Sequence, residues 1–387
     1  MHEVFDIIVV GLGANGSSAL YNLSKTNKKV LGIDRHTPPH SYGSSHGESR
    51  IIRQAYHENP IYVPLVKAAY MLWEEIEKDA GATLFQKTGG IMLGREDSYV
   101  VAGARLSAET HHIPYEFLNS AAIQKRFPAF RPSPDTVGIL EKEAGILFPE
   151  ECIKAFLARA TANKADIRYN ETVLGITPKN DNVEVITSKG TYIAEKVIIT
   201  AGAWTSELLP ALQLLLSVER QVLFWFKNGN TQTQSHFLPG NMPIYIWEYL
   251  PGKLFYGFPD LGNGVKTAHH HAGRSIRPDE IRQDAAKEEI SEMEGIVNRY
   301  LYMDPIFTTS TVCMYTNTPD EDFIIDFHPA CKNIIIASPC SGHGFKFSSL
   351  TGKLLSDMAT GNKINFDLTP FSITRPSIGT SIRPSDH

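Results

Sequence analysis

The N-terminal stretch of the chain carries the feature that most constrains its fold. Phe5–Val10 reads FDIIVV, an apolar run rich in β-branched residues that is typical of a buried parallel strand. The run GLGANG (Gly11 to Gly16) follows at once, and a helix fits from Ala14 to about Lys25. Lys29–Ile33 then predicts a second strand, which ends at Asp34. This order predicts a βαβ unit within a parallel sheet covered by helices.

The three glycines of this unit have the spacing G-x-G-x-x-G. Gly11 allows the tight turn, Gly13 lets a pyrophosphate approach the backbone, and Gly16 lets the helix pack closely on the strand. Free N–H groups and the dipole at the helix N-terminus favour an anion there. Asp34 stands where a carboxylate meets ribose hydroxyls. The motif therefore predicts a dinucleotide site rather than a βα turn that binds nothing, but it does not separate FAD from NAD.

Strand and helix patterns recur along the rest of the chain. Helices are expected from Pro64 onward and at Glu151–Asn163, Pro278–Arg299 and Ser348–Met358. Strands are expected as a pair within Leu84–Leu93 and at Ile167–Val173, Val183–Ile186, Thr191–Ala194, Lys196–Thr200, Gln221–Phe226, Leu254–Phe258, Phe323–Ile325 and Asn333–Ala337. The stretch Arg105–Leu140, with its prolines, is expected to be irregular. The parts of the dinucleotide-binding unit are thus dispersed over the start, middle and end of the chain.

Composition narrows the classes of partner. The net charge of −5 gives no positive excess that would favour nucleic acid or anionic lipid. No apolar run approaches membrane-spanning length, and only Met1–Val4 precede the first strand, so we expect neither a membrane segment nor a leader. The four cysteines form no CxxC pair, which favours a reducing compartment. We therefore expect a cytoplasmic protein.

Two arginines stand three residues apart in the segment SSHGESRIIR. On a helical turn, Arg50 and Arg53 would share a face. Two guanidinium groups among apolar neighbours favour an anion site, either for a substrate carboxylate or for the electron-rich edge of a flavin. The alternative is a surface pair that makes ordinary salt bridges.

A glycine-rich turn, SGHGFK, separates a predicted buried strand from the last helix. The amides at that helix N-terminus could face an anionic ring edge. Lys346 lies between Phe345 and Phe347, an unusual setting for a solvated lysine. The alternative is an αβ turn with an exposed lysine.

Three consecutive histidines raise the question of a metal. In a strand, only His269 and His271 would share a face. No acidic or cysteine partner lies at ligand spacing, so we expect no metal site.

Six segments together carry a resemblance to a known family: FDIIVVGLGANGSS, PPHSYGSSHGESRIIRQAY, YGFPDLGNGVK, VCMYTNTPDEDFIID, SGHGFKFSS and FDLTPFSITRP. Over essentially its whole length the chain resembles the monomeric sarcosine oxidase and N-methyl-L-tryptophan oxidase family of FAD-dependent amine oxidases. TPDEDFIID and FDLTPF are closer to the N-methyltryptophan oxidase branch.

The resemblance implies an α/β fold: a Rossmann-like FAD-binding domain of the glutathione-reductase-like type with an inserted mixed β-sheet substrate domain. The FAD-binding domain is expected to be discontinuous, from residues 1–84, 145–216 and 317–387. Residues 85–144 and 217–316 are expected to form the substrate, or catalytic, domain. A monomer is expected.

The resemblance also implies roles for single residues. Arg53 and Lys346 match the residues that bind the substrate carboxylate. The expected catalytic residues are Arg50 beside the flavin, Lys266 for reaction with O2, and Tyr256 and His270 in the substrate pocket. Cys313 matches the cysteine that holds FAD by a thioether, whereas composition alone would leave it as a buried free cysteine. The residues expected to bind FAD are Gly11, Gly13, Gly16, Asp34, Arg35, Ser44, His46, Val173, Cys313, Gly342, His343, Gly344 and Lys346.

The chain departs from the family pattern at two places. Ser45 stands where the family usually has a histidine, and Pro339-Cys340 precede the SGHG turn where a glycine and a larger apolar residue are usual. Cys340 would lie near the flavin ring, which makes it a second candidate for the tether. These departures bear on the shape of the pocket and hence on the substrate.

The resemblance implies oxidative demethylation of a secondary N-methyl amino acid, of the N-methyl-L-tryptophan or sarcosine type. O2 would be reduced to H2O2, and the imine would be hydrolysed to amino acid and formaldehyde. The alternatives are a flavin-dependent dehydrogenase, an oxidase of a cyclic secondary amino acid such as pipecolate, a non-catalytic FAD-binding module, and an NAD-dependent dehydrogenase.

Overall fold

The N-terminal βαβ unit forms as the glycine pattern predicts. In the computed structural model, which describes residues 3–281 and 284–378, β1 (Glu3–Val10) leads into α1 (Ala14–Ser24). β2 (Val30–Ile33) then pairs parallel with β1. Gly11 has φ +88°, and a Cβ there would lie 2.7 Å from the carbonyl oxygen of Thr200. Only glycine allows the chain to turn in this way so close to the neighbouring backbone.

This unit belongs to an eight-stranded sheet, the first sheet. Its parallel part has the order β9-β2-β1-β12-β19, with β18 antiparallel to β19 and the β10–β11 ribbon attached to β12. The further strands are β9 (Asp166–Arg168), β10 (Val173–Lys179), β11 (Asn182–Thr187), β12 (Thr191–Ile199), β18 (Ile324–His328) and β19 (Cys331–Ser338).

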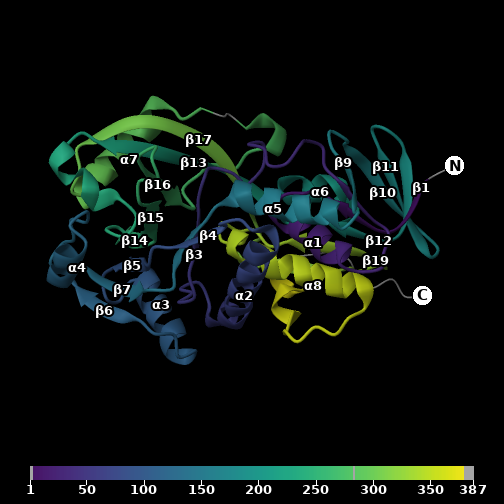
Figure 1. Cartoon of the computed structure of the whole chain (residues 1–387), viewed down its shortest axis with the longest axis horizontal. Coiled ribbons are helices and arrows are strands. Elements are labelled where there is room, and N and C mark those ends of the chain that lie inside the picture. The colour runs from purple at the N-terminus through teal and green to yellow at the C-terminus, as the bar shows by residue number, and fades with distance from the viewer. Residues whose placement is uncertain (1–2, 282–283, 379–387) are drawn as a thin grey trace.

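Four helices pack together against one face of the first sheet (Figure 1). They are α1, α2 (Val63–Ala80), α5 (Pro149–Ala162) and α8 (Ser348–Thr360). Side chains alternate across the strand, so Ile7 and Val9 join the core under these helices. Ile8 and Val10 pack on the opposite face, with residues of the β10–β11 ribbon. Both faces of β1 are therefore buried, which explains its continuous apolar run.

A second eight-stranded sheet has the order β17-β13-β16-β15-β14-β5-β7-β6. Only β14 and β5 are parallel, so the sheet is mixed. Its strands are β5 (Gly90–Gly94), β6 (Glu116–Asn119), β7 (Val137–Glu141), β13 (Ser217–Asn228), β14 (Ile244–Leu250), β15 (Lys253–Phe258), β16 (Val265–His270) and β17 (Pro305–Asn317).

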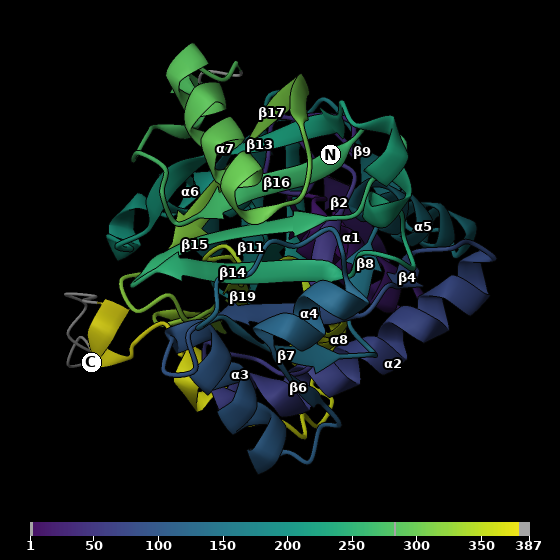
Figure 2. The ribbon, with the colours of Figure 1, turned by 90° about the vertical axis from the view of Figure 1, so that its left-hand side faces the viewer.

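The two faces of the second sheet have different roles. Figure 2 shows α7 (Lys287–Tyr300) and α4 (Ser120–Arg126) in front of the sheet, where they form an apolar core with Phe226 and Trp247. The opposite face carries Leu223, Trp225, Cys313 and Tyr315, and it faces the first sheet and its loops. The sheet therefore has one face for stability and one face that is available for a site.

A small third sheet lies between the two larger ones. It has the order β3-β8-β4, from β3 (Arg50–Ile52), β8 (Gly145–Leu147) and β4 (Phe85–Lys87). The expected strands within Leu84–Leu93 both exist, but β4 pairs with β8 and β5 with strands of the second sheet, so the expected pairing between them is wrong.

Other expectations also need correction. Residues 105–140 are largely regular, with the end of α3 (Tyr99–Thr110), β6, α4 and the start of β7, because the four prolines fall between elements. Thr191–Ala194 and Lys196–Thr200 form one strand, β12. The expected strand Ile167–Val173 is interrupted, since β9 ends at Arg168 and β10 begins at Val173. The helix expected from Pro278 begins at Lys287.

The α/β fold class is confirmed. The first sheet draws on residues 3–33, 166–199 and 324–338, and the second on 90–141 and 217–317. These are the segments that we assigned to the two domains, except that β4 joins the third sheet. The domain boundaries themselves remain a prediction.

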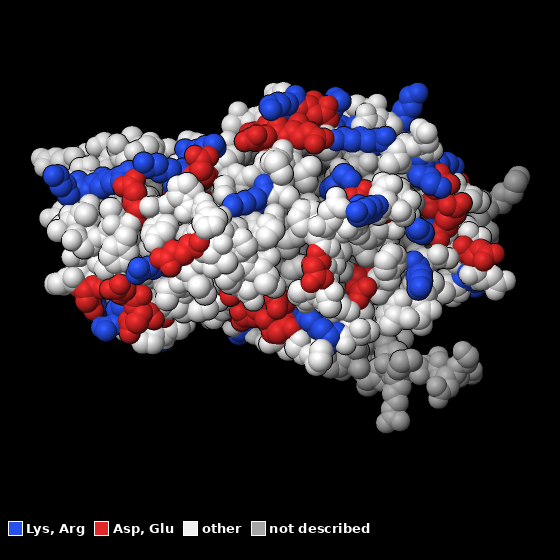
Figure 3. Space-filling view, turned by 90° about the horizontal axis from the view of Figure 1, so that it is seen from below, with Lys and Arg blue, Asp and Glu red and all other residues white. Residues whose placement is uncertain are grey.

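On the side shown in Figure 3, acidic and basic side chains lie interspersed. Within the described ranges, none of the helices combines the length and the apolar character needed to cross a bilayer.

Candidate active site

Two adjoining cavities lie where the sheets meet. The glycine-loop cavity, of about 340 Å³, lies at the end of the βαβ unit, and its walls include Gly11, Gly13, Asp34, Arg35 and Val173. The inner cavity, of about 120 Å³, has walls that include Arg50, Arg53, Tyr256, His270, Cys313, Gly342, His343, Gly344 and Lys346. Both cavities are lined by Ala14, Asn15, Ser44, Ser45 and Cys340, so they run into each other.

The glycine-loop cavity fits a dinucleotide. Gly13 has no side chain to cap the N-terminus of α1, where Ala14 N donates to Ser45 Oγ at 3.4 Å, and a Cβ at Gly13 would meet only Ser45 Oγ at 3.8 Å, so the backbone of Gly13 is open to a ligand. The carboxylate of Asp34 is buried at the cavity wall and accepts the Leu12 N–H at 2.7 Å. Gly16 lines neither cavity. A Cβ there would lie 1.8 Å from Gly11 O, which accounts for a glycine in the helix–strand contact.

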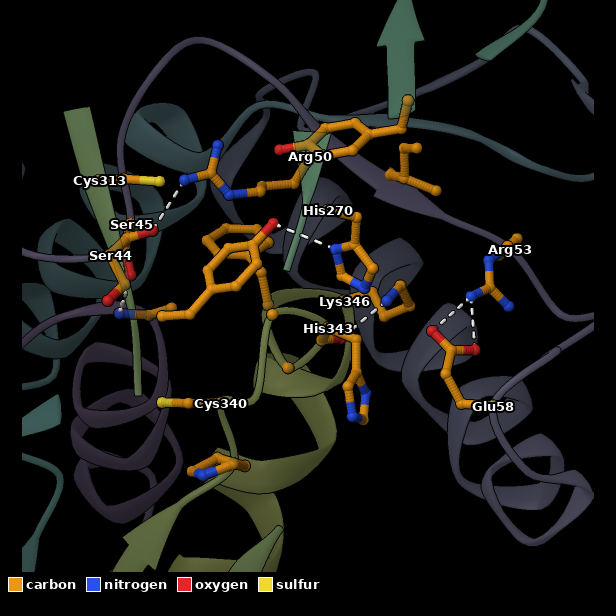
Figure 4. A pocket seen from close by; sticks show the side chains of 18 of the residues that line it. Ser44, Ser45, Arg50, Arg53, Glu58, His270, Cys313, Cys340, His343 and Lys346 are labelled. Atoms are coloured by element: carbon orange, nitrogen blue, oxygen red, sulfur yellow. Dashed lines mark hydrogen bonds and ion pairs between the residues drawn. The ribbon is translucent and has the colours of Figure 1, made fainter. Parts of the chain in front are cut away.

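Arg50 and Arg53 do not share a helical face. Arg50 lies in β3, and in an extended chain residues three apart point to opposite sides. Arg50 donates from Nη2 to Ser44 O at 2.7 Å, on the Cys313 side of the inner cavity. Arg53 lies at the other side, as Figure 4 shows. The helical interpretation of this segment is wrong, because β3 pairs with β8, from a distant part of the chain.

Arg53 already holds a carboxylate of its own chain. The guanidinium is 1% exposed, and its Nη2 donates to both oxygens of Glu58, at 2.7 and 2.6 Å. Burial raises the pKa of Glu58, but Arg53, with smaller contributions from His57, His343 and Lys346, holds it well below its usual range. The sequence analysis missed Glu58, since an acid in the same loop does not by itself reveal its partner. Arg53 is thus a buried ion-pair member, not a surface arginine.

Lys346 is buried in the same cavity. Its Nζ donates to His343 O at 2.7 Å and lies 5.1 Å from the ring centroid of Tyr56. Burial, with a contribution from Arg53, lowers the pKa of Lys346 to about 7. The alternative of an exposed lysine is therefore wrong. Arg53 and Lys346 therefore lie as two buried basic side chains in the wall of one cavity.

The second sheet supplies the opposite wall. Tyr256 pairs with Ala268 across β15 and β16, and His270 lies two residues further on the same face. His270 Nδ1 lies 3.3 Å from Tyr315 Oη, and burial holds the pKa of His270 well below its usual value. Cys313 is two residues before Tyr315 in β17, so both face the cavity. Strand register thus brings together side chains that are far apart in sequence.

The two cavity cysteines differ in position. Cys313 lies in the wall of the inner cavity, and burial raises the pKa of its thiol while Arg50 and Lys266 oppose the shift. Cys340 lies where the two cavities join, and burial raises the pKa of its thiol to about 11. Of the two, Cys313 is the one whose shift is opposed by neighbouring cations.

Lys266 and His46 do not line either cavity. Lys266 is buried behind the loop that immediately precedes β3 (the β3 loop). There Nζ donates to Gly47 O at 2.6 Å, Ser49 O at 2.8 Å and Ser49 Oγ at 3.0 Å. Burial, helped by Arg50, lowers the pKa of Lys266 well below its usual value. His46 lines a separate hollow beside Glu150. Burial lowers its pKa to about 4.

His343 lines the inner cavity with its ring already engaged. Nδ1 is hydrogen-bonded to the Tyr56 hydroxyl, Nε2 lies 3.1 Å from Glu321 O, and the ring stacks on Phe323. Its side chain therefore supports the turn, while Gly342 and Gly344 present backbone to the cavity.

The histidine run has other partners. His271 Nδ1 lies 3.3 Å from Glu219, and His269 Nε2 lies 3.7 Å from Glu292. Among residues 3–281 and 284–378, the structure contains no group of three side chains placed to hold a metal ion.

The model of a family described as FAD dependent oxidoreductase matches residues 6–358. The chain belongs to this family. The family identifies the dinucleotide of the glycine-loop cavity as FAD. The alternative of an NAD-dependent dehydrogenase is therefore excluded.

Relatives and solved structures agree. A protein of Streptomyces avermitilis named monomeric sarcosine oxidase is 40% identical over 93% of this chain and 94% of its own length. One of Citrobacter koseri named N-methyl-L-tryptophan oxidase is 36% identical over 96% and 99%. The resemblance to this group is confirmed. The structure of NikD, titled an unusual amino acid oxidase, covers 100% of both chains with a TM-score of 0.86 at 23% identity, and shows the same fold.

Proposed function

We propose that this FAD-dependent oxidoreductase oxidises the N-methyl group of a secondary amino acid, as a monomer. O2 is reduced to H2O2, and the imine is hydrolysed to amino acid and formaldehyde. The observation that carries this proposal is the pair Arg53 and Lys346, two buried cations in a cavity that opens into the glycine-loop cavity. The names of the relatives support the substrate class, since they are oxidases of sarcosine and of N-methyl-L-tryptophan.

The residues on the cavity walls fit FAD. In this proposal Gly11, Gly13 and the N-terminus of α1 hold the pyrophosphate, and Asp34 binds a ribose. Arg35, Ser44, Val173, Gly342, His343 and Gly344 border the remainder of the cofactor, and Cys313 forms a thioether with it. When bound, the flavin accepts two electrons from the substrate and passes them to O2.

The inner cavity orients the substrate. Arg53 and Lys346 bind its carboxylate, and a carboxylate that takes over the Nη2 donors of Arg53 displaces Glu58, whose two oxygens they now hold. The walls contributed by Tyr256 and His270 exclude water. A pocket that holds two cations disfavours a third positive charge, so it favours the neutral amine that the oxidation needs. Fixed orientation and electrostatics are the protein's contribution to the rate.

Two further cations act at the flavin side in this proposal. Arg50 lies in the wall of the inner cavity. Together with the N–H groups at the start of α8, it would stabilise the negative charge of a reduced flavin. Lys266 supplies positive charge where O2 takes electrons. Its Nζ is bound to Gly47 and Ser49 of the loop that precedes β3, so the charge is held in a fixed place behind the cavity wall.

The test is peroxide release from the purified flavoprotein with sarcosine, N-methyl-L-tryptophan, pipecolate and proline. We expect peroxide and formaldehyde in equal amounts with an N-methyl amino acid. The Arg53→Met variant should lose roughly 100-fold or more in kcat/KM, since a buried charged contact is removed. If only pipecolate gives peroxide, and no formaldehyde is formed, the substrate is a cyclic secondary amino acid rather than an N-methyl amino acid. Electron transfer only to an artificial acceptor would indicate a dehydrogenase, and no turnover at all would indicate a non-catalytic FAD module.

A further inference from the structure

His57 lies in the wall of the inner cavity without a hydrogen-bond partner. The residue is 4% exposed, and neither Nδ1 nor Nε2 has a hydrogen-bond partner among the described residues. Backbone contacts hold the segment in place, since a Cβ on Gly103 of α3 would lie 2.3 Å from His57 O. Buried polar groups are normally paired, because an unpaired one loses its contact with water. The ring of His57 is therefore unpaired in the ligand-free site, and a ligand-bound state of the site can supply its partner.

The nearest charged group is Glu58. Its Oε2 lies 3.5 Å from His57 Nδ1, close enough for attraction but without a hydrogen bond. The other titratable groups around the ring are Arg53 of the same loop, Lys346 and His343 of the C-terminal turn, His270 of β16 and Tyr99 of α3. Burial lowers the pKa of His57 to about 3; Glu58 opposes this shift, whereas Arg53, Lys346 and His343 add to it. The ring is neutral in this state.

A bound carboxylate changes this balance. The inference rests on the proposed function, in which the substrate carboxylate binds Arg53. Arg53 is 1% exposed and its Nη2 holds both Glu58 oxygens, so a carboxylate that takes over these Nη2 donors displaces Glu58. Glu58 is 15% exposed, which leaves it room to move. The incoming charge then neutralises Arg53 and Lys346, the cations that oppose a charged His57, while Glu58 loses its own cation.

We propose that His57 takes up a proton when a carboxylate binds, and becomes the new partner of Glu58. The proton comes from solvent and joins the ring nitrogen that faces Glu58, and no electrons are transferred. His57 is thus a positioning residue: it acts on the substrate through Glu58 and Arg53. It would keep the displaced carboxylate within the pocket wall and make binding depend on pH.

The sign of this dependence follows from proton linkage. The complex carries one proton more than the free protein wherever the pH lies between the free pKa of His57 and its higher value in the complex. Within that window, affinity for a carboxylate falls as pH rises, by up to about tenfold per pH unit.

The experiment is titration calorimetry of the FAD-loaded protein with propionate at about pH 6, in two buffers of different ionisation enthalpy. Propionate has no amine, so its own groups do not release protons there. We expect uptake of up to roughly one proton per propionate in the wild type. In His57→Gln, which keeps hydrogen-bonding capacity but cannot titrate near neutrality, we expect uptake near zero. In Glu58→Gln we expect loss of uptake and tighter binding, since Arg53 has no competing anion.

Lys346 is the main other group that could take up a proton when propionate binds. With a pKa of about 7 it is already roughly nine-tenths protonated at pH 6, so it can add only about a tenth of a proton. Uptake that persists unchanged in His57→Gln would overturn the inference. If His57→Gln fails to bind flavin, NMR of the histidine-labelled wild type replaces it: propionate should convert one imidazole to imidazolium, and an unchanged spectrum would overturn the inference.

Failure of the proposed function has a different result. If Arg53→Met leaves propionate affinity unchanged, the carboxylate site itself is misplaced. If affinity depends on Arg53 but no protons are taken up, the substrate site stands and the role of His57 is wrong.

Discussion

At the scale of single residues, the site is defined by buried charge. Arg53, Lys346 and Lys266 are all buried, and Glu58 neutralises only the first through hydrogen bonds. Glu141, fully buried in β7, accepts the backbone N–H groups of the two residues that follow Arg53 and so holds that loop. Burying so many charges costs stability, because each loses its hydration. A protein retains such groups where a ligand of opposite charge uses them.

Lys266 provides the clearest test at this scale. We expect Lys266→Met to slow the reaction of the reduced enzyme with O2 by about 10²–10³-fold, since a preorganised charge is lost. Anaerobic reduction by substrate should change little, because Lys266 does not line the inner cavity. Stopped-flow absorbance measures the two reactions separately. Lys253→Met, an exposed lysine on neighbouring β15, is the control and should change neither. Equal losses in both reactions would contradict this role.

At the scale of elements, close packing and strand register place the site. The alternation of side chains on β16 and β17 puts Lys266, His270 and Cys313 on the face of the second sheet that looks toward the first. α1 meets β1 closely enough that only glycine fits at Gly16. Both features depend on tenths of an ångström in the backbone rather than on any single side-chain contact.

Gly16→Ala tests the helix–strand contact. The new Cβ would lie 1.8 Å from Gly11 O and 2.6 Å from Thr200 Oγ1, so backbone must shift. We expect a loss of about 1–3 kcal/mol in the free energy of unfolding, together with a lower flavin content. Gly295→Ala is the control. Gly295 is exposed in α7, and a Cβ added there would meet no atom within 4 Å, so the free energy of unfolding should rise by about 0.5–1 kcal/mol. Urea unfolding and the ratio of flavin to protein absorbance measure both. Equal stability of the two variants would show that α1 can move away from β1 freely.

At the scale of the whole molecule, the cavities join the two large sheets. The glycine-loop cavity belongs to the first sheet, whereas Tyr256 and Cys313 reach the inner cavity from the second. Figure 4 shows Cys313 in this place. A bound FAD would therefore contact both sheets at once. Anything that binds only the folded state stabilises it, so the cofactor should link the stabilities of the two halves.

The thioether to Cys313 is testable at this scale. After denaturation in acid, we expect the yellow colour to stay with the wild-type chain and to map to the peptide that contains Cys313. Cys313→Ser should release the flavin and lower the midpoint of thermal unfolding, because FAD can then dissociate from between the sheets. Cys340→Ser, at the junction of the cavities, is the matched control and should keep the colour. Colour that maps to Cys340 would move the tether, and colour that washes out of the wild type would exclude it.

The sequence alone determined the features that depend on neighbours along the chain. The βαβ unit, its glycine turn and Asp34 follow from local periodicity and from the conformational freedom of Gly11, and the family follows from short segments spread over the whole length. Helix and strand positions followed for the same reason, wherever the pattern was not interrupted.

Only the tertiary structure decided what depends on partners distant in sequence. β3 is a strand because β8 pairs with it, and this pairing sends Arg50 and Arg53 to opposite sides of the inner cavity. The pairing of Arg53 with Glu58, the position of Lys266 behind the β3 loop and the unpaired ring of His57 likewise arise from packing between segments. Charge state and access to a ligand depend on burial, and burial is set by the whole fold, because water is excluded only when all the walls of the cavity are in place.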